Sequence, residues 1–189
     1  APMGIVTPID PSNGIFPAQE TPAILTPEAV EQGEPQPNHE SFQERDGEDL
    51  PPGHTVIQEH VANGFGYLFR DRAAAEAYLG AKIVTAPLGT ISKTKPDGSV
   101  KHRVIMDLRA NRVNDAVSLP ERQVLPTMFN HAADLAELAA QCGPTDQVAS
   151  LVLDISDAFM GIPLGRPELR FNACQMDHPL VRNRPALCD

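Results

Sequence analysis

The chain has few cysteines, and none of them belongs to a metal-binding pair. Its 189 residues include three, Cys142, Cys174 and Cys188, and no C-x-x-C spacing occurs. An odd number of widely spaced thiols argues against a disulfide framework, and the missing ligand pairs argue against a zinc ribbon. The cysteine content therefore predicts a protein of a reducing, intracellular compartment.

Apolar runs of membrane-spanning length are also missing. No apolar run in the sequence approaches the ~20 residues that a transmembrane helix needs. The N-terminus lacks the basic and apolar regions of a signal peptide. We therefore expect a soluble chain without a membrane partner.

Basic residues are almost absent from the first part of the chain. Residues 1–53 contain ten Pro, ten Asp or Glu and a single basic residue, Arg45, so ten minus one gives nine of the ten net negative charges. A segment of this composition cannot bury enough apolar surface to offset the entropy lost on ordering. We expect residues 1–53 to be an acidic, Pro-rich disordered segment, with the folded part beginning near His54.

Positive charge gathers further along the chain. Within residues 82–122, eight basic residues outnumber the acidic ones. Residues 95–99 read Lys-Pro-Asp-Gly-Ser, a strong turn signal, and β-branched residues lie on both sides of it. We expect a β-hairpin over residues 82–108 with Lys93, Lys95, Lys101 and Arg103 near its tip. Such a tip suits a phosphate partner, and a solvated strand face is the other interpretation.

Helices are expected on both sides of this hairpin. Apolar residues recur at helical spacing over residues 56–61, and residues 71–79 are Ala-rich and end at Gly80. A third helix is predicted over residues 127–142, before Gly143-Pro144. Because no regular β-α-β repeat occurs, this order of elements predicts an α+β fold.

An apolar strand over residues 148–153 is expected to end beside two carboxylates, Asp154 and Asp157. Three consecutive apolar residues, 151–153, fit a strand that is buried on both faces. Asp157 can cap a helix over residues 158–164. The pair is then either a strand-to-helix turn with its cap, or a place that holds a metal ion beside a nucleotide.

Three stretches of the sequence together carry a family resemblance. Residues 93–109, Leu125-Pro126 and residues 153–164 resemble the fingers and the first palm motif of retroelement reverse transcriptases, over about residues 82–171. The resemblance implies the fingers hairpin and partial palm of a right-hand polymerase. It also implies a retrotransposon RNA-directed DNA polymerase, a nucleotidyltransferase that uses deoxynucleotides, Mg²⁺ and an RNA or DNA template-primer.

The resemblance assigns roles to individual residues. Asp154 matches the catalytic, metal-binding carboxylate, and Phe159 matches the residue that lies beneath the sugar. Arg103 with Lys93 or Lys95 would bind the triphosphate, and both lysines remain candidates because Pro96 disturbs the usual Lys-Lys-Asp-Gly run. The backbone N–H groups of Asp157 and Ala158 would face the phosphates. In the alternative interpretation, Arg103 pairs with Asp97 or Asp107, and Phe159 is a core residue.

The family's second palm motif, aromatic-x-Asp-Asp, does not occur in the chain. Two-metal transfer needs such further carboxylates. We therefore expect a fragment that does not polymerise on its own, with residues 172–189 as an irregular tail.

A non-catalytic function is the alternative. Residues 64–69, with Phe65, Tyr67 and Phe69, approach the aromatic strand of RNA-recognition domains, whose rings stack on bases. Asn63 stands where that pattern has a basic residue, and Arg70 stands where it has the last aromatic. The chain would then be an RNA-binding module or a domesticated remnant, unless these aromatics pack the preceding helix against the hairpin.

Overall fold

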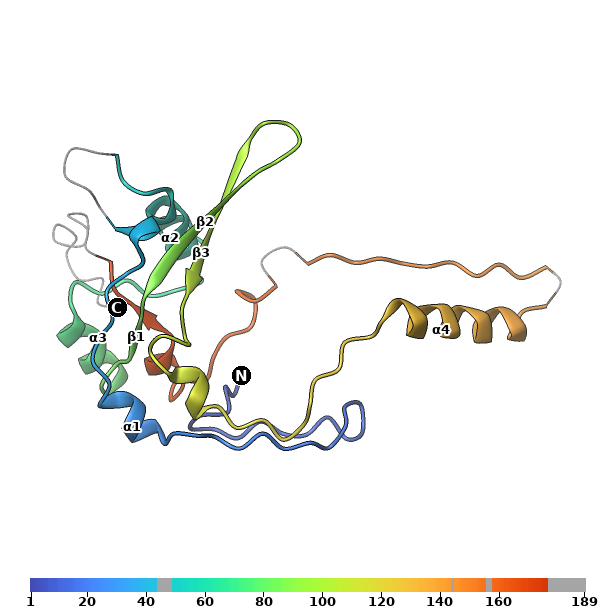
Figure 1. Ribbon diagram of the computed structural model, residues 1–189, viewed down its shortest axis with the longest axis horizontal. Helices are drawn as coiled ribbons and strands as arrows, with labels where there is room; N and C mark the ends of the chain where they lie inside the picture. Colours follow the sequence, from blue (N-terminus) through green and yellow to red (C-terminus); the bar gives the residue numbers. More distant parts are fainter. Residues whose placement is uncertain (44–48, 144, 156–157, 177–189) are drawn as a thin grey trace.

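The computed structural model describes residues 1–43, 49–143, 145–155 and 158–176 (Figure 1). Helices and strands are mixed along the chain, which is compatible with the expected α+β class. No helix in these ranges is long and apolar enough to cross a bilayer. In chain order the elements are α1 (Pro27–Glu31), the 3-10 turn η1 (Glu40–Phe42), α2 (Pro52–Ala62), α3 (Arg72–Leu79), β1 (Thr85–Ala86), β2 (Leu88–Thr94), β3 (Val100–Met106), η2 (Val113–Ala116), α4 (Met128–Gln141), η3 (Leu169–Phe171) and β4 (Ala173–Cys174).

Strands β2 and β3 form the predicted antiparallel hairpin. Their register pairs Leu88 with Met106 at the base and Thr94 with Val100 near the tip. Gly98 in the turn has φ +81°, a conformation that glycine adopts without steric cost. The hairpin prediction is confirmed over residues 88–106.

The three helices expected on the two sides of the hairpin are also confirmed, and local signals specify α3 and α4. At the start of α3, the Asp71 carboxylate accepts a hydrogen bond from the N–H of Ala74 (2.8 Å), and Gly80 ends the helix with φ +70°. Thr127 caps α4 through a capping box with Asn130. Helix α2 covers the apolar spacing of residues 56–61.

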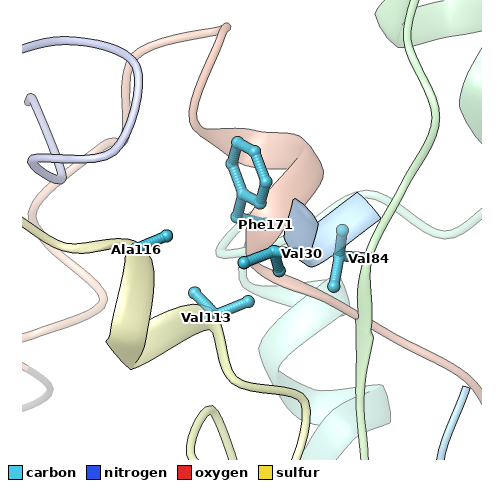
Figure 2. Close-up of a cluster of buried hydrophobic side chains, with 5 residues drawn as sticks. All are labelled: Val30, Val84, Val113, Ala116 and Phe171. Carbon is cyan, nitrogen blue, oxygen red and sulfur yellow. The ribbon is translucent and has the colours of Figure 1, made fainter. Parts of the chain in front are cut away.

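The core joins parts of the chain that are distant in sequence. β1 pairs with β4 in parallel, with Thr85 opposite Ala173. Beside this ladder lie the buried side chains of Val30, Val84, Val113, Ala116 and Phe171 (Figure 2). Because these residues come from α1, the approach to β1, η2 and η3, the core depends on long-range packing and not on any single segment.

The N-terminal segment takes part in this packing. Val30 and Phe42 are only 2% and 1% exposed, and the Phe42 ring stacks on His54 with 4.5 Å between ring centroids. The carboxylate of Glu168, which is fully buried, accepts hydrogen bonds from the N–H groups of Met3, Val6 and Thr7. Sequence analysis expected folding to begin near His54, whereas buried contacts in the structure begin well before that residue.

Helix α4 and residues 145–155 form an arm that extends away from the core (Figure 1). No residue of α4 is buried. The predicted strand over residues 148–153 is wrong, since these residues are irregular and Leu151, Val152 and Leu153 are 78–87% exposed. A buried strand needs a neighbouring strand and covering layers, and none of the described residues supplies them here.

The predicted helix over residues 158–164 is also wrong, and the strand of the alternative RNA-binding interpretation is not formed. Residues 158–161 form a turn in place of the predicted helix, because Gly161 disfavours helix and Pro163 has no N–H to donate. Residues 64–69 contain no strand, and Gly64 has φ +78° directly after the end of α2. The predicted cap at Asp157 lies outside the described residues, as does the tail from residue 177 onward.

Candidate functional site

The tip of the β2–β3 hairpin is held by a compact set of hydrogen bonds. Lys95 N–H donates to the Ser99 carbonyl (2.8 Å), and Gly98 N–H donates to the Lys95 carbonyl (3.0 Å). The Asp97 carboxylate accepts from the Ser99 hydroxyl (2.6 Å) and N–H (2.8 Å), and these bonds hold the Asp97 pKa below its ordinary value. The turn therefore holds the adjoining ends of β2 and β3, which carry the basic residues, in a fixed position.

Three of the four basic side chains near the tip share one face of the hairpin. The register places Lys93 opposite Lys101 and Ile91 opposite Arg103. Cross-strand partners and residues two apart project to the same side of a sheet, so Lys93, Lys101 and Arg103 form one basic face. All three are exposed, and no ion pair within the described residues engages them.

Helix α2 lies against the opposite face. Thr90 and Val104, which face each other in the register, are partly buried there. Gly53, at the start of α2, approaches so closely that a Cβ at this position would collide with the Thr90 side chain and the Phe42 ring. Because α2 covers that side, the basic face is the one that remains open to a ligand.

A groove of about 560 Å³ continues from the base of the basic face. Ile91 and Ile105 line it from the hairpin, and Arg109 and Asn114 line it from the segment after β3. His39 and Ser41 of the N-terminal segment form part of its wall. The groove is thus lined by both apolar and polar side chains, and it lies next to the basic face.

One wall of the groove is held by Asp107. Its carboxylate accepts hydrogen bonds from the N–H groups of Ala110 (2.9 Å) and Arg109 (3.1 Å), and it lies 3.1 Å from His39 Nε2. The bond from Ala110, followed by those from Arg109 and His39, outweighs the effect of burial and holds the Asp107 pKa below its ordinary value. Within the described residues, no ion pair joins Arg103 to Asp97 or Asp107, so the alternative pairing is not formed there.

Of the other predicted site residues that the structure describes, none lines the groove at the hairpin. Asp154 is exposed in the irregular segment 145–155. Ala158 is exposed, Phe159 is 89% exposed and thus outside the core, and Asp157 lies outside the described residues. Of the predicted site residues, Lys93 and Arg103 therefore lie on one surface, and Lys95 lies in the turn beside it.

The predicted magnesium site depends on Asp154. Among them, no three His, Cys, Asp or Glu side chains gather in a group that could hold a metal ion. Mg²⁺ requires near-octahedral oxygen coordination, and Asp154 contributes a single carboxylate to it. A role for Asp154 in binding Mg²⁺ stays a prediction from the sequence.

Sequence reasoning missed His39 and Ser41. Both lie in the segment that was expected to be disordered, and no local pattern marks them. Their place is set by bonds along the edge of β2, where Leu88 N–H donates to Asn38 Oδ1 (2.8 Å) and Thr90 N–H donates to Ser41 Oγ (3.0 Å). Only the tertiary packing of this segment brings them to the groove.

Comparisons of the chain with protein-family models, with curated proteins and with solved structures give no match.

Proposed function

We propose that the chain is a fingers module of a reverse transcriptase, whose basic hairpin face binds the triphosphate of a deoxynucleotide. The observation that carries this proposal is the alignment of Lys93, Lys101 and Arg103 on one uncovered face, free of carboxylate partners in the described structure. A guanidinium and two ammonium groups on one surface complement the charge of a polyphosphate. The parent enzyme would carry out RNA-templated DNA synthesis on an RNA or DNA template-primer.

Triphosphate binding tests this proposal directly. Titration of the full chain with dTTP, with and without Mg²⁺, should give saturable binding that Arg103→Gln weakens about tenfold, because a charge-assisted hydrogen bond contributes roughly 1.5–3 kcal/mol. Arg122→Gln is the matched control, since Arg122 is also exposed but lies outside the hairpin. Equal loss in both variants would mean that dTTP senses only overall charge, and the proposal would then fail.

Catalysis by the isolated chain is a separate question. We expect no template-directed primer extension. Two-metal transfer needs several carboxylates, and among the described residues the resemblance assigns a catalytic carboxylate to Asp154 alone. A primer-extension assay with Mg²⁺ and all four deoxynucleotides measures this. Synthesis that depends on the template would show that the chain supplies a complete catalytic centre.

A further inference from the structure

An aromatic cluster lies away from the hairpin, between the end of α2 and helix α3. The ring centroid of Tyr78 lies 5.6 Å from that of Tyr67 and 5.3 Å from that of Phe69. Tyr67 and Phe69 are 6.4 Å apart and tilted by 32°. We call Tyr67, Phe69 and Tyr78 the aromatic patch.

The aromatic patch is only partly used for packing. Tyr67 is 69% exposed and Tyr78 is 43% exposed, whereas Phe69 is partly buried beside them. Phe65, in contrast, packs on α2, with its ring centroid 6.1 Å from that of His60 in an edge-on contact. The sequence alone left base stacking and core packing as alternatives, and the two tyrosines retain ring surface that the core does not cover.

An arginine from the C-terminal part of the chain completes the patch. The guanidinium carbon of Arg166 lies 5.2 Å from the centroid of the Tyr78 ring, and Arg166 Nη2 donates to the Tyr78 carbonyl (2.6 Å). A second groove, of about 290 Å³, lies beside it and is lined by Leu79, Ala81, Arg166, Pro167 and Arg170. Rings and a cationic groove therefore meet at one place, although Tyr78 and Arg166 are distant in the sequence.

Arg166 differs from the other arginines nearby. Arg70 pairs with Asp71 (2.9 Å), Arg72 pairs with Glu76 (2.9 Å), and Arg170 pairs with Glu31. Within the described residues, Arg166 has a carbonyl and a ring as partners but no carboxylate. Its positive charge remains available to an anion that lies against the tyrosines.

We propose that the aromatic patch and Arg166 bind single-stranded nucleic acid, with a base stacked on Tyr67 and a backbone phosphate at Arg166. Exposed aromatic rings beside an arginine are the combination that single-strand binding sites use, since every base offers a π-face and every linkage a negative charge. This site is separate from the basic hairpin face and does not depend on the function proposed for that face.

The amino-acid composition provides a probe for this site. The chain has no tryptophan and two tyrosines, Tyr67 and Tyr78, so its tyrosine fluorescence arises entirely from the aromatic patch. Titration with oligouridylate or oligodeoxythymidylate of about twelve nucleotides, within the usual range of single-strand sites, should quench this emission saturably. N-acetyltyrosinamide in the same titration corrects for light absorbed by the oligonucleotide. Comparing the two oligonucleotides tells whether RNA or DNA is preferred.

Variants separate stacking from general attraction. With fluorescein-labelled oligonucleotide and anisotropy detection, Tyr67→Ala should weaken binding about tenfold, whereas Tyr67→Phe keeps the ring and the affinity. Arg166→Gln should weaken binding and reduce its dependence on salt. Phe129→Ala is the matched control, because Phe129 is 88% exposed on α4 and lies outside the patch.

A variant of the hairpin serves as a further control, and several outcomes would overturn the proposal. Arg103→Gln should leave the tyrosine quenching unchanged, which distinguishes this site from the dTTP site. The proposal is overturned if no quenching exceeds the reference, or if Tyr67→Ala binds oligonucleotide as tightly as the parent. Self-association in sedimentation that Tyr67→Ala abolishes, without oligonucleotide binding, would identify the patch as a protein interface instead.

Discussion

Asp107 joins the end of β3 to the N-terminal segment through His39. Because hydrogen bonds lower its pKa in the folded protein below the ordinary value of 3.8, Asp107 stabilises the fold at any pH above that value. This contribution disappears as the pH falls through the folded pKa. We therefore predict that Asp107→Asn lowers the melting temperature at neutral pH, and that the difference from the parent vanishes in strong acid. Thermal melts at neutral pH, at about pH 4 and at about pH 2 measure it.

Asp134→Asn is the control for this residue. Asp134 is exposed on α4, and no hydrogen bond or ion pair of its side chain appears within the described part of the chain. Its substitution should leave the melting temperature unchanged across the same pH series. A difference between Asp107→Asn and the parent that persists undiminished in strong acid would contradict the role given to the ionised carboxylate.

At the scale of elements, α4 is a helix whose stability depends on local interactions alone. It has 14 residues and a capping box, and none of its residues is buried. Isolated helices of this length are marginal in water. Thr127→Ala should therefore lower the local stability of α4 by ~1 kcal/mol, seen as faster amide exchange in α4, while the global unfolding transition stays in place.

Helix α3 provides the comparison for α4. Asp71 caps α3 through a single side-chain hydrogen bond, yet α3 buries Ala75 and carries Tyr78 of the aromatic patch. Asp71→Ala should therefore shift the global unfolding transition as well as local exchange. If Thr127→Ala also shifted global unfolding, α4 would have to pack on the core in solution.

The elements that were predicted correctly are mainly those that turn and capping residues within the element itself specify. The Pro-Asp-Gly turn, the Asp71 and Thr127 caps and the Gly80 terminus each act within a few residues, so the hairpin and helices could be recognised from the sequence. The strand over residues 148–153 could not be judged this way, because an apolar run becomes a strand only if another strand pairs with it. The same holds for the site: turn chemistry predicts the basic tip, whereas His39 reaches the groove by long-range contacts.

At the scale of the whole molecule, the N-terminal segment contributes buried contacts to the rest of the chain. Its removal exposes the core around Val30 and Phe42, and it takes the N–H donors of Met3, Val6 and Thr7 away from the buried Glu168 carboxylate. A buried acceptor without its donors costs about 1–3 kcal/mol, more when it is charged. We predict that a chain beginning at His54 unfolds at clearly lower urea concentration than the full chain.

A pair of valines makes this prediction specific. Val30 is 2% exposed in the core and Val152 is 87% exposed in the arm, so the same change removes the same atoms from opposite environments. Val30→Ala should cost about 2 kcal/mol of unfolding free energy, because it leaves a cavity, and Val152→Ala should cost almost nothing. If the truncated chain and Val30→Ala both unfold at the urea midpoint of the full chain, residues 1–53 act as the disordered spacer that their composition suggests. A lowered midpoint in both means that this acidic segment is part of the folded domain.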